Sequence, residues 1–141
     1  MFFIQKDTDG KQHGLIVSKT ESEGPWQSTP NETITNAKST WDGDSNTNLM
    51  TDSPIKNYAS TLGEDWYIPA IDELNTLYNA RLIVNKSLEK SNFTIIGLRS
   101  DYWASVELDQ FKAYSLNCAN GTIEYGWAKY QTISVRPIKA F

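Results

Sequence analysis

DWYIPAIDELNTLY, residues 65–78, predicts a helix in the middle of the chain. The helix is expected to begin at about Ile71, because Leu74 and Tyr78 then fall on the same face and pack inward. Two acidic residues follow in its first turn, where they complement the positive end of the helix dipole. Ala70 is a poor N-cap, so the start of this helix has no capping side chain of its own.

A shorter helix is expected just before this stretch, in SPIKNYASTLG (53–63). Ser53 can cap its N-terminus, Pro54 suits the first helical position and Gly63 ends it. After the central helix, NKSLEKS (85–91) is expected to add a further turn or two. The middle of the chain is therefore predicted to be helical.

Strands are expected on the N-terminal side of these helices. FFIQKDTDGKQHGLIVS (2–18) is typical of two short strands around the Asp9-Gly10 turn. Residues 19–51 are mostly Ser, Thr, Asn, Asp, Glu and Gly, and are interpreted as a long surface segment pinned by Trp26 and Trp41.

Strands are also expected on the C-terminal side. YWASV (102–106) predicts one, and AYSLNCANGTIEYGW (113–127) predicts a hairpin with Asn120-Gly121 as its two-residue turn. ISVRPIKAF (133–141) closes the chain, and Pro137 indicates an edge or a bulge there. Strands, helices and strands in this order indicate an α+β fold with an antiparallel sheet.

The chain ends are expected to meet in that sheet, with Phe2–Ile4 paired antiparallel to Ile138–Phe141. The hairpin register further places Leu116, Cys118 and Ile123 on a buried face, since strand side chains alternate between faces. Tyr125 and Trp127 share that face by strict alternation, but Gly126 between them indicates a bulge or bend. We therefore expect Ile123 to be buried, Trp127 half-buried and Tyr130 on a surface loop.

Composition limits the classes of protein to consider. A chain of 141 residues is the size of one domain, so residues 1–141 are predicted to form a single unit. The net charge of −4 is mild and Lys and Arg are scattered, so nucleic acid is not an expected partner. No apolar run is long enough to insert into a membrane, and the first residues lack the features of a signal peptide.

The residues that could carry catalysis or bind a metal are few. Cys118 and His13 could form a nucleophile pair, but Cys118 is expected in the core, where a free Cys behaves as a small hydrophobe. Asp42, Asp44 and Asn46 are spaced like the start of a calcium loop, yet the Gly and Glu that complete such a loop are missing. These residues are better explained by bonds to their own backbone. No enzyme activity, metal or cofactor is therefore expected.

Several motifs recur together, in this order, in one bacterial family. They are Asn46-Thr47, DWYIPAIDELNTLY, YWASVE (102–107), Asn120-Gly121 and VRPIKAF (135–141). The chain resembles the Lcl C-terminal family, also met as the Fibrobacter major paralogous domain. Ala70, Ala104-Ser105-Val106 and Cys118 depart from the usual pattern of that family.

The resemblance implies a C-type-lectin-like domain, in which the terminal strands pair, two helices flank the sheet and an upper set of loops displays the binding face. It implies roles in adhesion to glycans or host surfaces, in phage receptor binding, or in ligand display by retroelement-diversified proteins. By analogy with the last group, the variable surface would comprise Leu108 to Lys112, Asn117, and Thr122 to Gln131. Glu124, Trp127 and the glutamines nearby argue against active diversification, because adenine-directed mutation of Asn codons cannot produce them.

Rigid rings interleaved with adaptable polar groups near the C-terminus have the composition of a binding site. The candidate ligand-binding residues are Leu108, Asp109, Gln110, Phe111, Lys112, Asn117, Glu124, Tyr125, Trp127, Tyr130 and Gln131.

The sequence does not separate a glycan ligand from a protein ligand. It favours a non-enzymatic binding domain for adhesion or receptor recognition, displayed on a cell surface or a virion as part of a larger assembly. The alternative is a structural module of a phage fibre, tail or surface appendage, held by homo-oligomer contacts such as those of a trimer.

Overall fold

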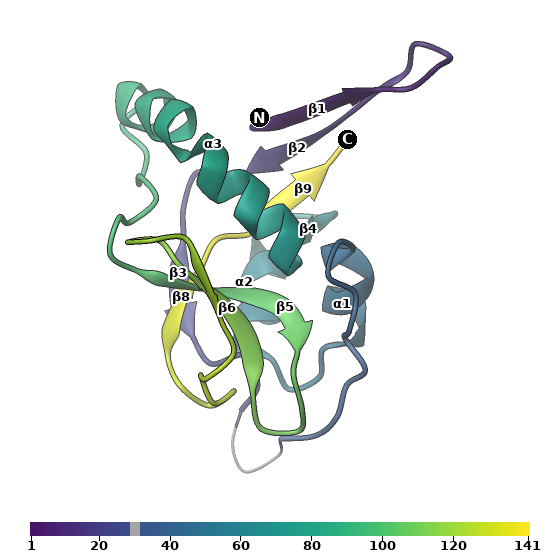
Figure 1. The fold of residues 1–141 in the computed structure, drawn as a ribbon, viewed down its shortest axis with the longest axis vertical. Helices are drawn as coiled ribbons and strands as arrows, with labels where there is room; N and C mark the ends of the chain where they lie inside the picture. Colours follow the sequence, from purple (N-terminus) through teal and green to yellow (C-terminus); the bar gives the residue numbers. More distant parts are fainter. Residues whose placement is uncertain (29–31) are drawn as a thin grey trace.

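The computed structural model describes residues 1–28 and 32–141 and shows an α+β arrangement of helices around two sheets (Figure 1). The predicted class is therefore confirmed. The strands among the described residues are β1 (Phe3–Lys6), β2 (Gln12–Val17), β3 (Ser22–Gly24), β4 (Trp66–Tyr67), β5 (Asp101–Glu107), β6 (Ala113–Asn117), β7 (Thr122–Glu124), β8 (Ile133–Val135) and β9 (Ile138–Ala140). The helices there are α1 (Gly43–Leu49), α2 (Pro54–Thr61) and α3 (Ile71–Lys90).

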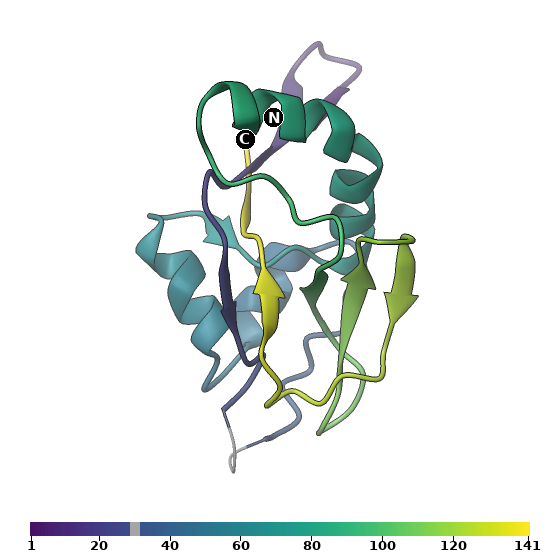
Figure 2. The ribbon, with the colours of Figure 1, turned by 90° about the vertical axis from the view of Figure 1, so that its left-hand side faces the viewer.

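The strands form two sheets that are mostly antiparallel. One has the order β1-β2-β9-β4, and the other has the order β3-β8-β5-β6-β7 (Figure 2). The β5–β8 pair is parallel, while the other pairs within the two sheets are antiparallel.

The C-terminal stretch, expected as one closing segment with an irregularity at Pro137, is divided between the two sheets. Arg136 and Pro137 lie between β8 and β9, where the chain leaves one sheet for the other. The Arg136 guanidinium is buried, donates to the Ser18 carbonyl at 2.9 Å and pairs with Glu21 at 3.1 Å. These bonds fix the crossing between the sheets.

The two ends of the chain share a sheet, but they do not pair with each other as expected. β2 lies between them, with Leu15 opposite Phe3 on one side and opposite Ala140 on the other. The turn at Gly10 explains the difference, because its positive φ of 86° closes a short hairpin. Closing the short loop between β1 and β2 costs less conformational entropy than bringing β1 together with the C-terminus, which is distant in sequence.

The helices that the sequence predicts are present. The Ser53 hydroxyl accepts from the backbone N–H of Lys56 at the start of α2. α3 begins at Ile71 and continues without a break to Lys90, so it includes most of the turn or two expected at 85–91. The N–H of Ala70 donates to the Glu73 carboxylate at 2.8 Å, so Glu73 replaces the missing cap.

The segment 19–51 is more ordered than the sequence indicated; its residues 29–31 lie outside the described residues. It contributes β3 and α1, whose sequences are too polar to show a hydrophobic period. Trp26 is fully buried and donates from its ring N–H to the Ala104 carbonyl at 2.9 Å, as expected of a pinning residue. Trp41 is 71% exposed, so the prediction that it pins the segment is wrong.

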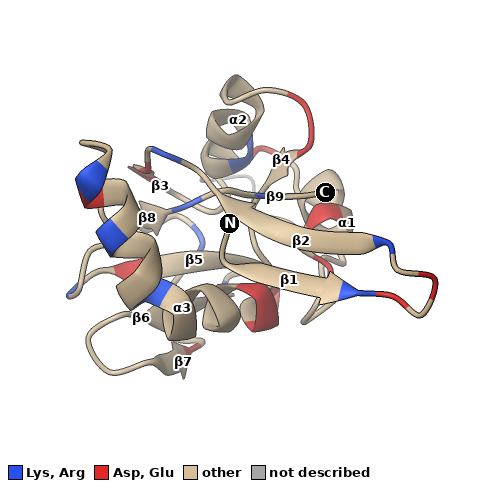
Figure 3. Ribbon diagram, turned by 90° about the horizontal axis from the view of Figure 1, so that it is seen from above, with Lys and Arg blue, Asp and Glu red and all other residues tan. Residues whose placement is uncertain are grey.

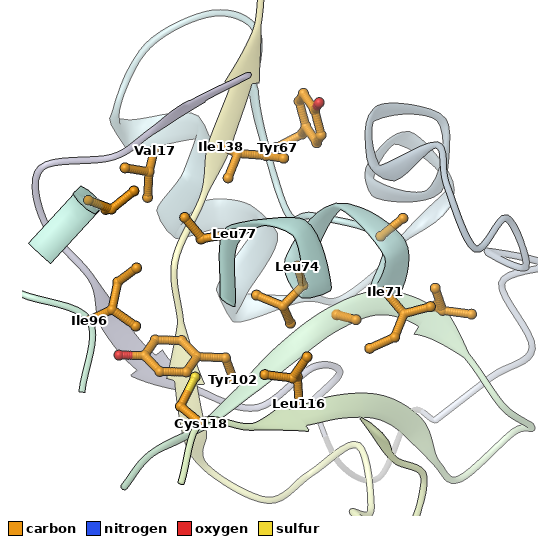
Figure 4. Close-up of a cluster of buried hydrophobic side chains, with 14 of the residues drawn as sticks. Val17, Tyr67, Ile71, Leu74, Leu77, Ile96, Tyr102, Leu116, Cys118 and Ile138 are labelled. Atoms are coloured by element: carbon orange, nitrogen blue, oxygen red, sulfur yellow. The ribbon is translucent and has the colours of Figure 1, made fainter. Parts of the chain in front are cut away.

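β5, inside the five-stranded sheet, is buried on both faces. Tyr102, Ala104 and Val106 of β5 pack against α3 in one hydrophobic cluster (Figure 4), while Trp103 faces the opposite way into a second cluster. Leu116 and Cys118 lie in the cluster under α3, as their place in the hairpin predicted.

The hairpin register differs from the expected one by two residues. Leu116 lies opposite Ile123, so the turn spans Cys118 to Gly121 and is longer than the two residues predicted. Ile123 is 38% exposed, and the prediction that it is buried is wrong. The reason is that β7 is a three-residue edge strand, whereas the buried Leu116 belongs to a strand with neighbours on both sides.

This difference in burial predicts the stability of a matched pair of variants. Leu116→Ala should lower the free energy of unfolding by about 2–5 kcal/mol, because it empties a fully buried site. Ile123→Ala should cost about 1 kcal/mol or less, because much of that side chain is already solvated. Chemical denaturation of both variants measures the two values, and equal losses would contradict the register described here.

Candidate functional site

Two segments expected to carry the binding site lie side by side at one end of the five-stranded sheet. The loop 108–112 joins β5 to β6, and the segment 125–132 joins β7 to β8 (lower end of Figure 1). The N–H of Lys129 donates to the Phe111 carbonyl at 2.8 Å, and Lys112 forms a bridge with Ala128. The structure thus brings together the predicted site residues from these two segments.

Four aromatic residues, Phe111, Tyr125, Trp127 and Tyr130, form what we call the rim. Phe111, Tyr125 and Tyr130 are each more than half exposed. Trp127 is partly buried against the second cluster, so its half-buried state and the surface position of Tyr130 are confirmed. Regular strand ends at Glu124, before Gly126, which frees these rings from strict alternation.

Tyr114 was not among the predicted site residues, yet it supports the rim. Its ring lies 5.7 Å from that of Tyr125 in an edge-to-face arrangement, a favourable geometry for aromatic pairs. Tyr114 itself packs against the cluster under α3. The sequence could have indicated this role, because strand alternation places Tyr114 on the same hairpin face as Tyr125.

Several polar site residues shape the two segments. The Asp109 carboxylate accepts from the N–H groups of Phe111 and Lys112 at 2.8 and 2.9 Å. The Gln131 side chain accepts from the N–H of Ala128 at 2.8 Å, and Glu124 accepts from the Trp127 ring N–H at 3.3 Å. These bonds hold the rings in place.

The remaining predicted site residues lie in different environments, and one of them lies away from the site. Leu108 is partly buried, Lys112 is exposed, and Gln110 donates from its amide to the Glu32 carbonyl at 3.2 Å. Asn117 lies at the opposite end of β6, where its side chain accepts from the N–H of Ala119 at 2.9 Å. The structure does not bring Asn117 together with the others.

A buried ion pair lies beneath the rim. The Lys129 ammonium contacts the Glu107 carboxylate at 2.7 Å, and both side chains are fully buried. Lys129 also donates to the Thr33 carbonyl at 3.0 Å and lies 4.7 Å from the centre of the Trp26 ring. Lys129 is not among the site residues predicted from the sequence. The signal that could have revealed the pair is Glu107, a charge at the end of an apolar strand.

Glu107 has further partners in the segment before α1. Its carboxylate accepts from the N–H and the hydroxyl of Thr35 at 2.7 and 2.9 Å, and from the N–H of Asn36 at 3.3 Å. Burial alone would raise the pKa of Glu107, but the bonds from Lys129 and Thr35 outweigh burial and hold it below its ordinary value. Burial lowers the pKa of Lys129, while Glu107 counteracts that shift.

The candidate nucleophile pair and calcium loop have other roles. Cys118 is buried, and burial raises the pKa of its thiol to about 11, so the thiol stays protonated at neutral pH. His13 instead contacts Asp7 at 2.8 Å. Asp42 caps α1 by accepting from the N–H of Ser45, and Asn46 bonds the backbone of Ser39. The part of the chain that the structure describes contains no cluster of three metal-ligating side chains.

Comparisons with known proteins support the fold. No protein-family model and no curated protein sequence matches the chain. A solved fimbrial protein from Bacteroides ovatus has a similar fold, with a TM-score of 0.72 and 17% identity over 91% of this chain. The chain covers 36% of that protein and so spans about a third of its length. At this identity the likeness concerns the fold alone. No helix among the described residues is both long and apolar enough to cross a bilayer.

Removing one partner of the buried ion pair should destabilise the domain strongly. Lys129→Met should lower the free energy of unfolding by about 3–5 kcal/mol, because it leaves the Glu107 carboxylate buried without its closest cation. Lys38→Met is the matched control. Lys38 also approaches Glu107, at 3.4 Å, but its side chain is 48% exposed, so its loss should cost at most about 1 kcal/mol. Similar losses in the two variants would contradict the role assigned to Lys129.

The lowered pKa of Glu107 also predicts a pH dependence. A carboxylate whose pKa is lower in the folded state stabilises the protein above its unfolded pKa, about 4.3 for Glu, and this stabilisation is lost as the pH falls through the folded value. The stability advantage of wild type over Glu107→Gln should therefore be full at pH 7 and should shrink below about pH 4. Urea denaturation across this range tests the prediction, which a constant difference would refute.

Proposed function

We propose that this chain is a non-enzymatic, C-type-lectin-like ligand-binding domain that serves adhesion or receptor recognition on a bacterial surface appendage or a phage particle. The observation that carries the proposal is the rim, where three large rings stand more than half exposed on hydrogen-bonded segments. Isolated exposed apolar residues are common, but rings gathered at one end of a sheet suit a binding surface.

The segments that carry the rim are ordered before any ligand arrives. Asp109 fixes the loop 108–112, Gln131 fixes the turn at Ala128, and Glu107 with Lys129 anchors both segments from below. A preorganised site avoids part of the entropy cost of binding, since its side chains and backbone need little further ordering. This favours recognition of a ligand by a fixed surface.

The chemistry of the rim fits a glycan or the surface of a protein. Rings such as Tyr130 and Trp127 can stack on the apolar face of a sugar, while Lys112 and Gln110 can bond its hydroxyls. The same mixture of aromatic and polar groups is typical of protein-binding sites. Neither ligand requires a metal or a cofactor at this surface.

The fold likeness is consistent with a place in a larger surface assembly. The protein with the similar fold is described as fimbrial, and the present chain matches about a third of it. A domain of this kind can display its rim outward while other parts of the assembly provide attachment.

The double variant Trp127→Ala/Tyr130→Ala tests the proposal. It should lose binding by at least tenfold to whichever glycan or host-surface protein the wild-type domain binds on arrays, because each ring supplies a large contact area. Phe93→Ala, at an exposed ring outside the rim, should bind like wild type. Thermal unfolding should show that the variants remain folded.

Two results would contradict the proposed site. One is undiminished binding by the folded double variant. The other is equal loss of binding in Phe93→Ala, which would indicate nonspecific adhesion through exposed rings. Failure of the wild-type domain to bind any surface, together with measurable turnover of a substrate, would overturn the functional class.

A further inference from the structure

An apolar groove lies far from the rim, beneath the projecting β1–β2 hairpin. We call it the hairpin groove; it has a volume of about 410 Å³, and its apolar lining comprises Phe3, Leu15, Trp41, Ala140 and Phe141. Figure 1 shows the hairpin extending beyond the body of the molecule, at the end opposite the loops of the rim. The Trp41 ring, 71% exposed, stands at this groove without being buried by the fold.

The groove continues a face that is buried elsewhere. Val17 and Ile138 are opposite each other in the β2–β9 pair and pack in the core with α3. Two residues further along, Leu15 and Ala140 occupy the same face, because strand side chains repeat every second residue. α3 begins at Ile71 and its first turn only borders the groove, so this part of the sheet has no helix over it.

A second apolar surface lies on the C-terminal half of α3 and on the segment that follows it. We call it the helix surface; its exposed apolar residues are Leu82 and Ile83 of α3 and Ile95 and Leu98 of the following segment. Ile83 also faces a separate hollow that Met1, Ile16 and Phe93 line. Leu82 and Ile83 are 66% and 74% exposed, although they occupy the middle of a long helix. A hollow of about 680 Å³ between this half of the helix and the following segment is lined by Leu82, Ile95 and Leu98.

The two surfaces carry opposite charges. Asp42, Asp44 and Asp72 border the hairpin groove and the hollow beside it, and the structure records no ion pair for these carboxylates among the described residues. Arg81 and Lys86 line the helix surface, with Glu89 as its acidic member. Figure 3 shows Lys and Arg on the C-terminal half of α3, and Asp and Glu at its N-terminus and on α1.

These surfaces are too far apart to cover each other within one copy. Asp72 and Lys86 are 14 positions apart on α3, which curves between its two halves (Figure 2), so they lie about 20 Å apart measured along the curved axis of the helix. Charges at the ends of α3 complement its dipole, but that effect does not explain the exposed Trp41, Leu82 and Ile83. Both surfaces are apolar, and the charges around them are opposite in sign. Two surfaces that bind each other are expected to have this complementarity.

We infer that the helix surface of one copy docks in the hairpin groove of another, so that copies of this chain associate head to tail. Leu82 and Ile83 would then cover Trp41 and Leu15, while Lys86 and Arg81 approach the carboxylates at the border of the groove. The contact joins two different surfaces, so it is heterologous and can repeat along a filament or close into a ring. The rim takes no part in it.

Complementation between two variants tests this geometry. Trp41→Ala removes the groove wall and leaves the helix surface intact; Leu82→Gln/Ile83→Gln does the reverse. In sedimentation velocity at low salt, wild type should form species larger than a dimer as its concentration rises. Each variant alone should stay monomeric, and a 1:1 mixture should form dimers that do not grow, because one intact groove then meets one intact helix surface. Added salt should weaken association.

The substituted side chains are largely exposed, so unfolding midpoints close to that of wild type are expected and confirm that the variants are folded. Wild-type protein that stays monomeric throughout would overturn the inference. So would a wild-type dimer that never grows, or a mixture of the variants that remains monomeric. Capture of a lysine-rich peptide by the groove of a strictly monomeric wild type would assign the groove to another protein, and would also overturn it. Unchanged binding at the rim by Trp41→Ala would separate this result from the proposed function.

Discussion

The contact between Glu107 and Lys129 is the constraint on which the arrangement of the loops depends. Three segments distant in sequence meet there: the end of β5, the connection to β8 and the backbone around Thr35. That backbone has no strand partner at this point, so its buried N–H groups need another acceptor. A carboxylate can accept several bonds at once, which an apolar side chain cannot. Glu107 therefore has two roles: it pairs with the buried Lys129 charge, and it accepts hydrogen bonds from the loop backbone.

The burial of the central part of the five-stranded sheet on both faces limits where a ligand could bind. α3 covers one face, and Trp26 with Trp103 fills the space against the other. Neither face of β5 is open to a ligand, which leaves the edges of the sheet and the loops at its ends as binding surfaces. The rim lies at such an end, next to the edge strand β7. The four-stranded sheet β1-β2-β9-β4 differs, because part of its core-side face around Leu15 extends beyond the helix that covers the rest.

Short-range patterns in the sequence predicted the features that depend only on neighbouring residues, such as helix caps, helix starts and turns. The Ser53 cap, the start at Ile71 and the turn near Gly10 each depend on a few neighbouring residues, and each is present. Ile123 and Trp41 were placed wrongly because their burial depends on which distant elements cover them. The rim followed from composition and resemblance. The buried state of Lys129 did not, since a lysine among polar residues carries no local sign of a partner 22 positions away.

The positions of the rim and the hairpin groove have a consequence for assembly. The two lie at opposite ends of the molecule, so head-to-tail contacts through the groove and the helix surface would leave every rim free (Figure 1). A weak ligand contact at one rim would then be repeated along the assembly, and linked weak contacts bind a multivalent surface far more tightly than a single one. An adhesive domain with a small aromatic site therefore gains most from a self-association surface that is separate from that site.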